Sequence, residues 1–342
     1  MILEEILEKV DGTNVGNTFL YFVTRILKSG VKKSSKMLDK HDFKVYQIDV
    51  DPEIREYLYS LTQEEIGKLI SKNLELANYE AVTDSIEQIF TYSMSNKAMS
   101  FKDVVENQLK RIPPKIISLN EILDGEELWA YCVALRHGEN DWIYTFKKIT
   151  ASKVAIDEKY SNKKTWFKRP LRTFFNTKSK KLELIKGETI NLDKQIDCIY
   201  YGDTFYIVKK TLFEQIIGLE EEYRQQAIAT IDEFRKTGKI VGHEIILAQI
   251  ERVPALHKKL VRIYKIGNFR TLNDSVIQKM KELCDLNGVV LKVVDGKLII
   301  EKEKDIEIVL RMLGEFYKRG TIWGELFEGY GGRKSTILSS KT

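Results

Sequence analysis

The residues best suited to chemistry in this sequence are gathered in one stretch, KYSNKKTWFKRPLRTFFNTKSKKL, at residues 159–182. This stretch contains nine lysines and arginines and five aromatic side chains, with no aspartate or glutamate. Arginine presents planar donors that match phosphate oxygens, and lysine supplies a point charge. Aromatic rings stack on nucleic-acid bases. The basic window, as we call residues 159–182, therefore combines the two interactions that hold a nucleic acid.

The basic window also holds the whole basic excess of the chain. Residues 1–158 carry 20 basic and 26 acidic side chains, and residues 183–342 carry 26 and 24, while the net charge of the chain is +5. Charge runs are usually solvated surface, and the pairs Trp166-Phe167 and Phe174-Phe175 could pin the segment to a sheet. The alternation of aromatic and cationic clusters in WFKRPLRTFF favours nucleic acid instead. Anionic lipid or an acidic protein partner remain alternatives.

A second basic surface is predicted on RVPALHKKLVRIYKIGNFR, residues 252–270. At helical spacing, Lys258, Arg262 and Lys265 fall on one stripe, while the leucine and isoleucine side chains between them face elsewhere. Two basic surfaces are suited to line a groove that binds a nucleic acid. The predicted nucleic-acid-binding residues are Lys163, Lys164, Trp166, Lys168, Arg169, Arg172, Lys178, Lys180, Lys181, Lys258, Arg262 and Lys265.

Candidate catalytic residues are sparse. The four histidines are distant from one another and from cysteine in the sequence, so no short-range zinc pattern and no HExxH motif exists. These histidines, which we expect at the surface or in hairpins, are His41, His137, His243 and His257. A nuclease would need clustered acidic residues and a lysine around a metal ion. Asp193, Asp197 and Asp203 are available, but their spacing does not distinguish them from turn residues. We therefore predict a protein that is not an enzyme and that needs no metal or cofactor.

Cysteine usage and the start of the chain bear on the compartment. Cys132, Cys198 and Cys284 are odd in number and far apart, without the paired spacing of a zinc site or a disulfide framework. The start, MILEEILEKV, is acidic where a secretory signal is basic, and no apolar run approaches the roughly 20 residues that span a bilayer. These features predict a cytoplasmic protein.

The elements that must position the basic window belong to an α+β fold, with mostly antiparallel sheet, flanking helices and a helical C-terminal half. Residues 1–114 form an α+β region, in which the pattern predicts helices at 2–10, from 51 and near 100–112, and strands at 18–27 and 42–50. The pair Pro113-Pro114 ends the last of these helices and marks the boundary. In residues 115–342 the pattern predicts strands at 128–136, 142–150 and 181–187, a hairpin at 198–210, helices at 219–234 and 244–266 with a break at Pro254, a helix at 273–286, a hairpin turning at Asp295-Gly296 and a helix at 304–318. The basic window thus connects two strands or extends them as a twisted ribbon.

Two stretches resemble a known family. They are DCIYYGDTFYIVKKTLFEQIIGLEEEYRQQA, a hairpin feeding a helix at residues 197–227, and the closing DIEIVLRMLGEFYKRGTIWGELFEGYGGRKST at residues 305–336. In pattern and order they resemble the domain of unknown function found in the KwaB family, the DNA-binding component of the Kiwa anti-phage system of bacteria. The resemblance covers roughly residues 115–337.

The resemblance implies a cytoplasmic effector that binds DNA without evident sequence preference. It also implies a small multi-pass membrane protein as a partner, which senses infection and can recruit the effector to the inner face of the membrane. It supplies no catalytic residue for any position of this chain. A metal-dependent nuclease and a scaffold that docks on an acidic partner or a membrane surface are the alternatives.

A homodimer is also expected. The N-terminal helix is amphipathic and, if exposed, needs an apolar partner, and a two-fold pair would double the phosphate contacts along a duplex.

Overall fold

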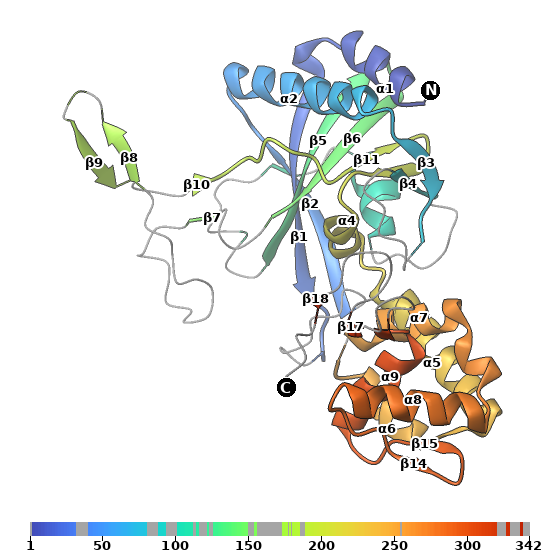
Figure 1. Cartoon of the computed structure of the whole chain (residues 1–342). Helices are drawn as coiled ribbons and strands as arrows, with labels where there is room; N and C mark the ends of the chain where they lie inside the picture. Colours follow the sequence, from blue (N-terminus) through green and yellow to red (C-terminus); the bar gives the residue numbers. More distant parts are fainter. Residues whose placement is uncertain are drawn as a thin grey trace. The chain divides into compact units, whose positions relative to one another are not determined.

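The chain folds into two compact units (Figure 1). A computed structural model describes residues 2–31, 40–80, 88–93, 101–111, 114, 115, 122, 126–149, 154, 155, 173–176, 178, 180–184, 189–253, 255–319, 326–328, 336 and 337. The first unit, here the sheet unit, comprises Met1–Tyr79 and Ser85–Leu219, and the second, here the helical unit, comprises Glu80–Asp84 and Glu220–Thr342. This division differs from the predicted regions 1–114 and 115–342, because strands from both of those regions pair within one sheet.

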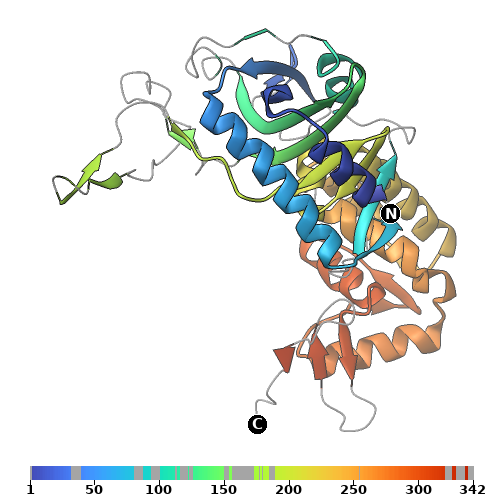
Figure 2. The same cartoon turned by 90° about the horizontal axis from the view of Figure 1, so that it is seen from above.

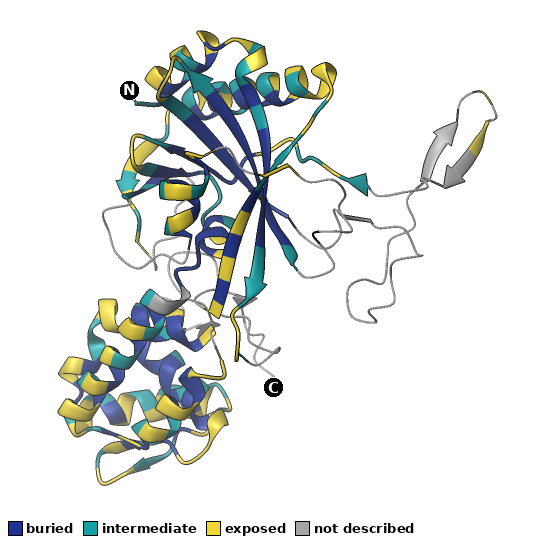
Figure 3. Ribbon diagram, turned by 180° about the vertical axis from the view of Figure 1, so that it is seen from behind, coloured by how far each residue is buried: buried dark blue, intermediate teal, exposed yellow. Residues whose placement is uncertain are grey.

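The sheet unit is built on eight strands. Neighbouring strands are antiparallel except for the last pair, which is parallel. In spatial order they are β2 (His41–Ile48), β1 (Thr18–Leu27), β5 (Glu127–His137), β6 (Asp141–Lys148), β11 (Cys198–Tyr201), β12 (Thr204–Ile207), β4 (Gln88–Ser93) and β3 (Glu75–Asn78). Figure 3 shows the central strands as mostly buried.

One face of this sheet is covered by two helices. The helices α1 (Ile2–Asp11) and α2 (Pro52–Ser71) lie side by side in both Figure 1 and Figure 2. They pack with the alternate strand residues that point to their side, such as Leu20, Val133 and Ile143. The apolar face of α1 is therefore buried inside the sheet unit, and the premise that it needs a second copy of the chain is wrong.

The other face of the sheet is partly covered by the helix α4 (Lys210–Ile217) and by a short π-helix at Val104–Gln108. Phe213 of α4 lies 5.4 Å, ring centroid to ring centroid, from Phe205 of β12. Phe101, just before the π-helix, lies 5.6 Å from Phe146 of β6. The prediction of a regular helix near 100–112 is thus wrong in form, since its central turn is wider than an α-helix.

Two small strand pairs lie in the long connection between β6 and β11. Strand β7 (Val154–Ala155) pairs with β10 (Thr189–Ile190), and β8 (Thr173–Asn176) pairs with β9 (Lys181–Leu184). Both pairs are antiparallel. The predicted strand that begins at residue 181 is confirmed by β9, which pairs with β8 inside the basic window in a sheet separate from β6 and β11. Residues 159–172 of the basic window lie outside the described residues.

The helical unit contains five α-helices among its described residues. They are α5 (Glu220–Thr237), α6 (His243–Ile250), α7 (Ala255–Ile266), α8 (Asp274–Leu286) and α9 (Glu303–Leu313). A small sheet of β13 (Ile240–Val241), β15 (Lys297–Ile299) and β14 (Val293–Val294) packs with them, and β16 (Tyr317–Arg319), β17 (Leu326–Glu328) and β18 (Thr336–Ile337) form another. The predicted break near residue 254 is confirmed by the end of α6 and the start of α7.

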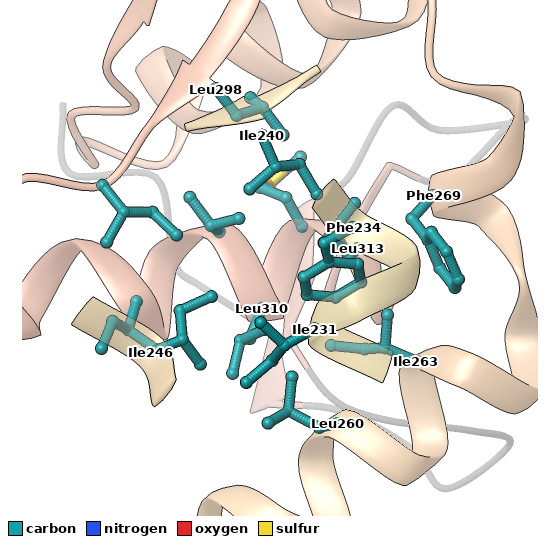
Figure 4. Close-up of a cluster of buried hydrophobic side chains, with 14 of the residues drawn as sticks. Ile231, Phe234, Ile240, Ile246, Leu260, Ile263, Phe269, Leu298, Leu310 and Leu313 are labelled. Carbon is teal, nitrogen blue, oxygen red and sulfur yellow. The ribbon is translucent and has the colours of Figure 1, made fainter. Parts of the chain in front are cut away.

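The core of the helical unit is apolar and continuous (Figure 4). Side chains from α5, α6, α7 and α9 converge there with those of β13 and β15, as Phe234, Ile246, Leu260 and Leu310 illustrate. Fully burying a side chain of this kind contributes about 1.5–3 kcal/mol. Backbones also come close: a Cβ at Gly242, whose φ is +87°, would lie 1.9 Å from the carbonyl oxygen of Ile300.

Turn chemistry was the most accurate local signal. Gly202 and Asp203 join β11 to β12, and Asp295 and Gly296 join β14 to β15, with positive φ at all four residues.

The helix predicted over 304–318 is too long, since α9 ends at Leu313 and the chain continues into β16. Among described residues the chain shows the predicted α+β class, with a mostly antiparallel sheet, flanking helices and a mainly helical C-terminal part.

Candidate nucleic-acid interface

Three of the predicted DNA-binding lysines lie at one hairpin. The strands β8 and β9 pair Asn176 with Lys181, so Lys178 and Lys180 lie in the connection between them. All three lysines are exposed, and Lys180 has a φ of 54°. The predicted residues that lie outside the described part of the chain are Lys163, Lys164, Trp166, Lys168, Arg169 and Arg172.

The sheet fixes both ends of the segment that carries the basic window. Strands β6 and β11 are neighbours, with Phe146 opposite Cys198, and the backbone N–H of Asp197 donates to the carbonyl of Phe146 at 2.9 Å. The chain therefore leaves the sheet after Lys148 and returns at Asp197, at the same place. The basic window is an insertion between two paired strands.

A buried ion pair closes the base of this insertion. The ammonium of Lys147 donates to Oδ1 of Asp197 at 2.8 Å, and Oδ2 of Asp197 accepts from the backbone N–H of Lys148 at 2.8 Å. The side chains of Lys147 and Asp197 are 3% and 0% exposed. Charges this deeply buried persist only when they are paired and hydrogen-bonded. The pair thus ties the last residues of β6 to the start of β11.

Two further charged groups surround the Lys147–Asp197 pair. The carboxylate of Asp193 lies 3.3 Å from the Lys147 ammonium, and the Lys209 ammonium donates to the side chain of Gln195. Burial, and then the neighbouring positive charge of Lys147, lowers the pKa of Lys209. The structure thus brings Asp193 and Asp197, two of the acidic residues considered for a nuclease, to one lysine. Both oxygens of Asp197 are already engaged by internal donors.

On the other face of β6, Lys148 is held by an aromatic ring. Its ammonium lies 3.5 Å from the centroid of the Trp129 ring and donates to the carbonyls of Trp129 and Ile149 at 2.8 and 2.9 Å. The guanidinium of Arg25 lies 3.8 Å from the same centroid, and the indole N–H donates to the carbonyl of Ile216 at 3.1 Å. Cation–π contacts and hydrogen bonds therefore also fix the point where the insertion leaves the sheet.

Sequence reasoning missed the buried lysines, although a signal existed. In WIYTFKKIT, the two lysines lie between Phe146 and Ile149, and all residues of 143–149 are buried, as in a strand that is covered on both faces. A lysine at such a position needs a partner for its charge, which is the carboxylate of Asp197 for Lys147 and the Trp129 ring with two carbonyl oxygens for Lys148. The sequence does not say which aspartate serves, because Asp197 lies 50 residues further along the chain.

The predicted stripe on α7 is confirmed in its geometry. Leu256, Leu260 and Ile263 are buried in the core of the helical unit, while Lys258 and Lys265 are exposed and Arg262 is partly exposed. The Lys258 ammonium lies 5.6 Å from the Tyr223 ring, and Lys265 forms an ion pair with Glu80. Part of the positive charge on this stripe is therefore already balanced within the chain.

The histidines and possible metal ligands were also located. His41 and His257 are buried rather than at the surface, and Nε2 of His257 lies 2.9 Å from the carbonyl oxygen of Ile250. The side chain of Asp203 accepts from the hydroxyl of Tyr200 at 2.9 Å in the β11–β12 turn. Within the described residues, no cluster of three or more histidine, cysteine, aspartate or glutamate side chains could hold a metal ion. None of the helices in this described part of the chain is long and apolar enough to cross a bilayer.

Comparison with known proteins gives one assignment. A family model described as "Kiwa protein KwaB-like" matches residues 125–322, which is more than half of the chain. No curated protein and no solved structure matches the chain significantly. The matched range begins beside β5 and includes the buried ion pair, the basic window and α5 to α9. The chain therefore belongs to the KwaB-like family of Kiwa proteins, and this membership associates it with Kiwa anti-phage defence.

Proposed function

We propose that this protein is a DNA-binding effector of anti-phage defence, which holds DNA through the basic window without reading its sequence. The observation that carries the proposal is the concentration of nine cations and five aromatic rings, without one acidic residue, in residues 159–182. Contacts of cations with phosphates supply most of the affinity of non-specific binding. The exposed lysines at the β8–β9 hairpin are three of these nine cations, and the exposed lysines Lys258 and Lys265 on α7 add to their charge.

The anchoring of the insertion supports the proposal. The Lys147–Asp197 pair and the contacts of Lys148 hold the two ends of the segment that carries the cations. A binding segment whose ends are fixed loses less conformational entropy when it engages a ligand. Binding residues on a connecting segment that is carried by a rigid sheet are a common arrangement.

We further propose that the protein acts without catalysis and with a membrane partner. Both oxygens of Asp197 bind internal donors, which favours a structural role for the acidic residues around Lys147 over a nuclease site. The proposed partner is a small multi-pass membrane protein of the same defence system, which would bring the effector to the inner face of the membrane. The proposed assembly of the effector is a homodimer.

Purified protein incubated with plasmid tests the proposal, with magnesium added in one arm and EDTA in the other. A gel shift without cleavage in both arms is the expected result. Cleavage that needs magnesium would support a nuclease instead. If the gel shows neither a shift nor cleavage, DNA binding is contradicted. The remaining alternative is then a scaffold that docks on an acidic partner or a membrane.

A charge-removal variant tests the assignment to the basic window. Changing Lys163, Lys164, Lys168, Arg169 and Arg172 to glutamine removes five cations. If each neutralises one phosphate, the slope of log affinity against log salt should flatten by about 4.5 on duplex DNA. The proposal also predicts that folding is nearly unaffected, because cations that bind DNA must be accessible to it and accessible charges contribute little to stability.

A matched control removes the same charge elsewhere. Its five lysine-to-glutamine changes are at exposed positions outside the basic window: Lys68, Lys72, Lys110, Lys279 and Lys281. This control should keep most of the affinity and of the salt slope. Equal losses in the two variants would mean that net charge, and not the basic window, sets the affinity. Unchanged affinity in the window variant would move the binding surface to Lys258, Arg262 and Lys265 on α7.

A further inference from the structure

A row of aromatic rings crosses the face of the sheet opposite α1 and α2. The ring centroids of Phe19 on β1 and Trp142 on β6 are 5.7 Å apart. The Trp142 ring is stacked on Tyr144 at 5.9 Å with an angle of 9° between the planes, and Tyr144 lies 6.1 Å from Tyr200 of β11. These residues alternate with those that pack under the helices, which places them on the other side of the strands.

Exposure is graded along this row. Tyr144 and Tyr200 are 2% and 3% exposed, and Tyr200 leads on to Phe205 and α4. Phe19 and Trp142, at the opposite end, are partly exposed. An aromatic row that ends at partly exposed rings offers a flat surface on which one more ring can stack.

A cation lies beside the exposed end. Arg136 is directly opposite Trp142 in the β5–β6 register, and its guanidinium carbon lies 5.8 Å from the ring centroids of both Phe19 and Trp142. Its Nη2 donates to the side-chain oxygen of Asn17 at 3.2 Å. The guanidinium is therefore held in place over the two rings.

Two polar atoms in this region are left without hydrogen bonds. The Nε of Arg136 and the hydroxyl of Tyr144 are both buried, and neither has a partner in the part of the chain that the structure describes. Buried polar groups are nearly always paired, so unpaired ones need an explanation. Both belong to residues that contact the Trp142 ring. A ligand with acceptor atoms at this place would supply what they lack.

The flat rings, the fixed guanidinium and the unpaired donors together define a ligand class. The ligand has a planar π-system that stacks on Trp142 and carries oxygen or nitrogen acceptors on its edge. We propose that the aromatic patch, formed by Phe19, Arg136, Trp142 and Tyr144, is a stacking site for a nucleobase. The inference rests on the proposed DNA binding, since it assigns the unpaired bases of a single strand to a surface distinct from the basic window. A free nucleotide carries the same chemistry.

Photocrosslinking of the full chain tests the aromatic patch. One probe is a thymidine oligomer with a single 5-iodouracil, and the second is 5-iodo-2′-deoxyuridine monophosphate. Irradiation links an iodinated base to an aromatic ring that it touches, and mass spectrometry of the digest identifies the peptide. The expected product of the oligomer carries the base on Phe19 or Trp142.

Three variants accompany the crosslinking. Trp142→Leu should weaken binding of the oligomer by about 5- to 150-fold, because stacking on one ring is lost, while duplex affinity changes less than about two-fold. Trp142→Tyr keeps a ring and should bind like the parent, so it preserves the test if the leucine variant folds poorly. Tyr57→Leu removes an exposed ring from α2, on the opposite face of the sheet, and should change nothing.

The outcomes separate the two proposals. If the oligomer binds and crosslinks only to other peptides, the aromatic patch is overturned and DNA binding stands. If the protein binds neither the oligomer nor a duplex, and the mononucleotide does not crosslink to the patch, both proposals fail. Crosslinking of the mononucleotide alone to Phe19 or Trp142 would confirm base recognition and identify a free nucleotide, not DNA, as the ligand.

Discussion

At the scale of single residues, the most unusual feature is a pair of buried opposite charges at a strand end. The side chains of Lys147 and Asp197 are almost inaccessible to solvent, and two further charged side chains, Asp193 and Lys209, lie close to them. Breaking such a pair usually costs more than the pair contributes, because the remaining charge stays buried without a partner. The pair therefore stabilises the register of β6 against β11, the two strands between which the insertion lies.

The contribution of the Lys147–Asp197 pair to stability can be tested by comparing single and double variants. Lys147→Met should lower the free energy of unfolding of the sheet unit by about 3–5 kcal/mol, since the carboxylate of Asp197 loses its cation. Lys147→Met combined with Asp197→Asn removes both charges and should be more stable than the single variant. Urea denaturation monitored by circular dichroism measures both.

The control for this comparison is Lys68→Met, at an exposed lysine of α2 that pairs with Glu65. It should leave the urea midpoint nearly unchanged, because exposed ion pairs contribute little. A double variant that is less stable than Lys147→Met would show that Asp197 does not depend on Lys147.

At the scale of elements, the start of α9 is held by one carboxylate. Oδ2 of Asp305 accepts from the backbone N–H groups of Glu301 and Lys302 at 3.0 and 3.1 Å. Burial alone would raise the pKa of Asp305, but these two hydrogen bonds and the nearby Lys292 lower it below the usual 3.8. The charged form is thus favoured in the folded helical unit, as expected for an acid at a helix N-terminus.

The pH dependence of stability follows from this shift. Because the pKa of Asp305 is lower in the folded protein than in the unfolded chain, its contribution is fully present above about 3.8 and is lost as the pH falls below that value. Asp305→Asn keeps the shape but not the charge, and should cost about 0.3–1 kcal/mol at pH 7. Near pH 2 the parent and the variant should be equally stable.

Thermal or urea unfolding of the helical unit at the two pH values measures this difference. Asp232→Asn, an exposed change away from both ends of α5, serves as the control and should behave like the parent at both pH values. A difference between parent and Asp305→Asn that persists unchanged at low pH would contradict the assignment.

At the scale of the whole molecule, the assembly state is the open structural prediction. The N-terminal helix gives no support for a dimer, since Leu3, Ile6 and Val10 are buried within the sheet unit. The remaining argument is that two copies of the basic window would engage one duplex with a higher effective concentration.

Mass photometry of the purified protein over a range of concentrations tests the dimer. A homodimer has twice the chain mass of 39.8 kDa. If it forms, dilution into monomers should weaken duplex binding more than it weakens binding to a short oligomer that spans one copy. A single monomer peak at every concentration would refute the homodimer and leave DNA binding by one copy to be judged on its own.

Some features of this protein were determined by the sequence alone, because they depend on neighbouring residues. The charge of the basic window is a property of composition, and Asp295-Gly296 forms a turn because those residues tolerate positive φ. The apolar and basic faces of α7 follow from helical spacing. The α+β class and the helical character of the C-terminal part follow from the same local periodicities.

The tertiary structure alone decided which distant residues meet. Lys147 and Asp197 pair because β6 and β11 are neighbours in the sheet, and the strand order that brings them together is not encoded in the pattern of either strand. Phe19 meets Trp142 for the same reason, since β1 and β6 both flank β5. Side-chain periodicity gives the face on which a residue lies but not its partner across the sheet. The buried Lys147–Asp197 pair and the aromatic patch therefore form only in the folded chain.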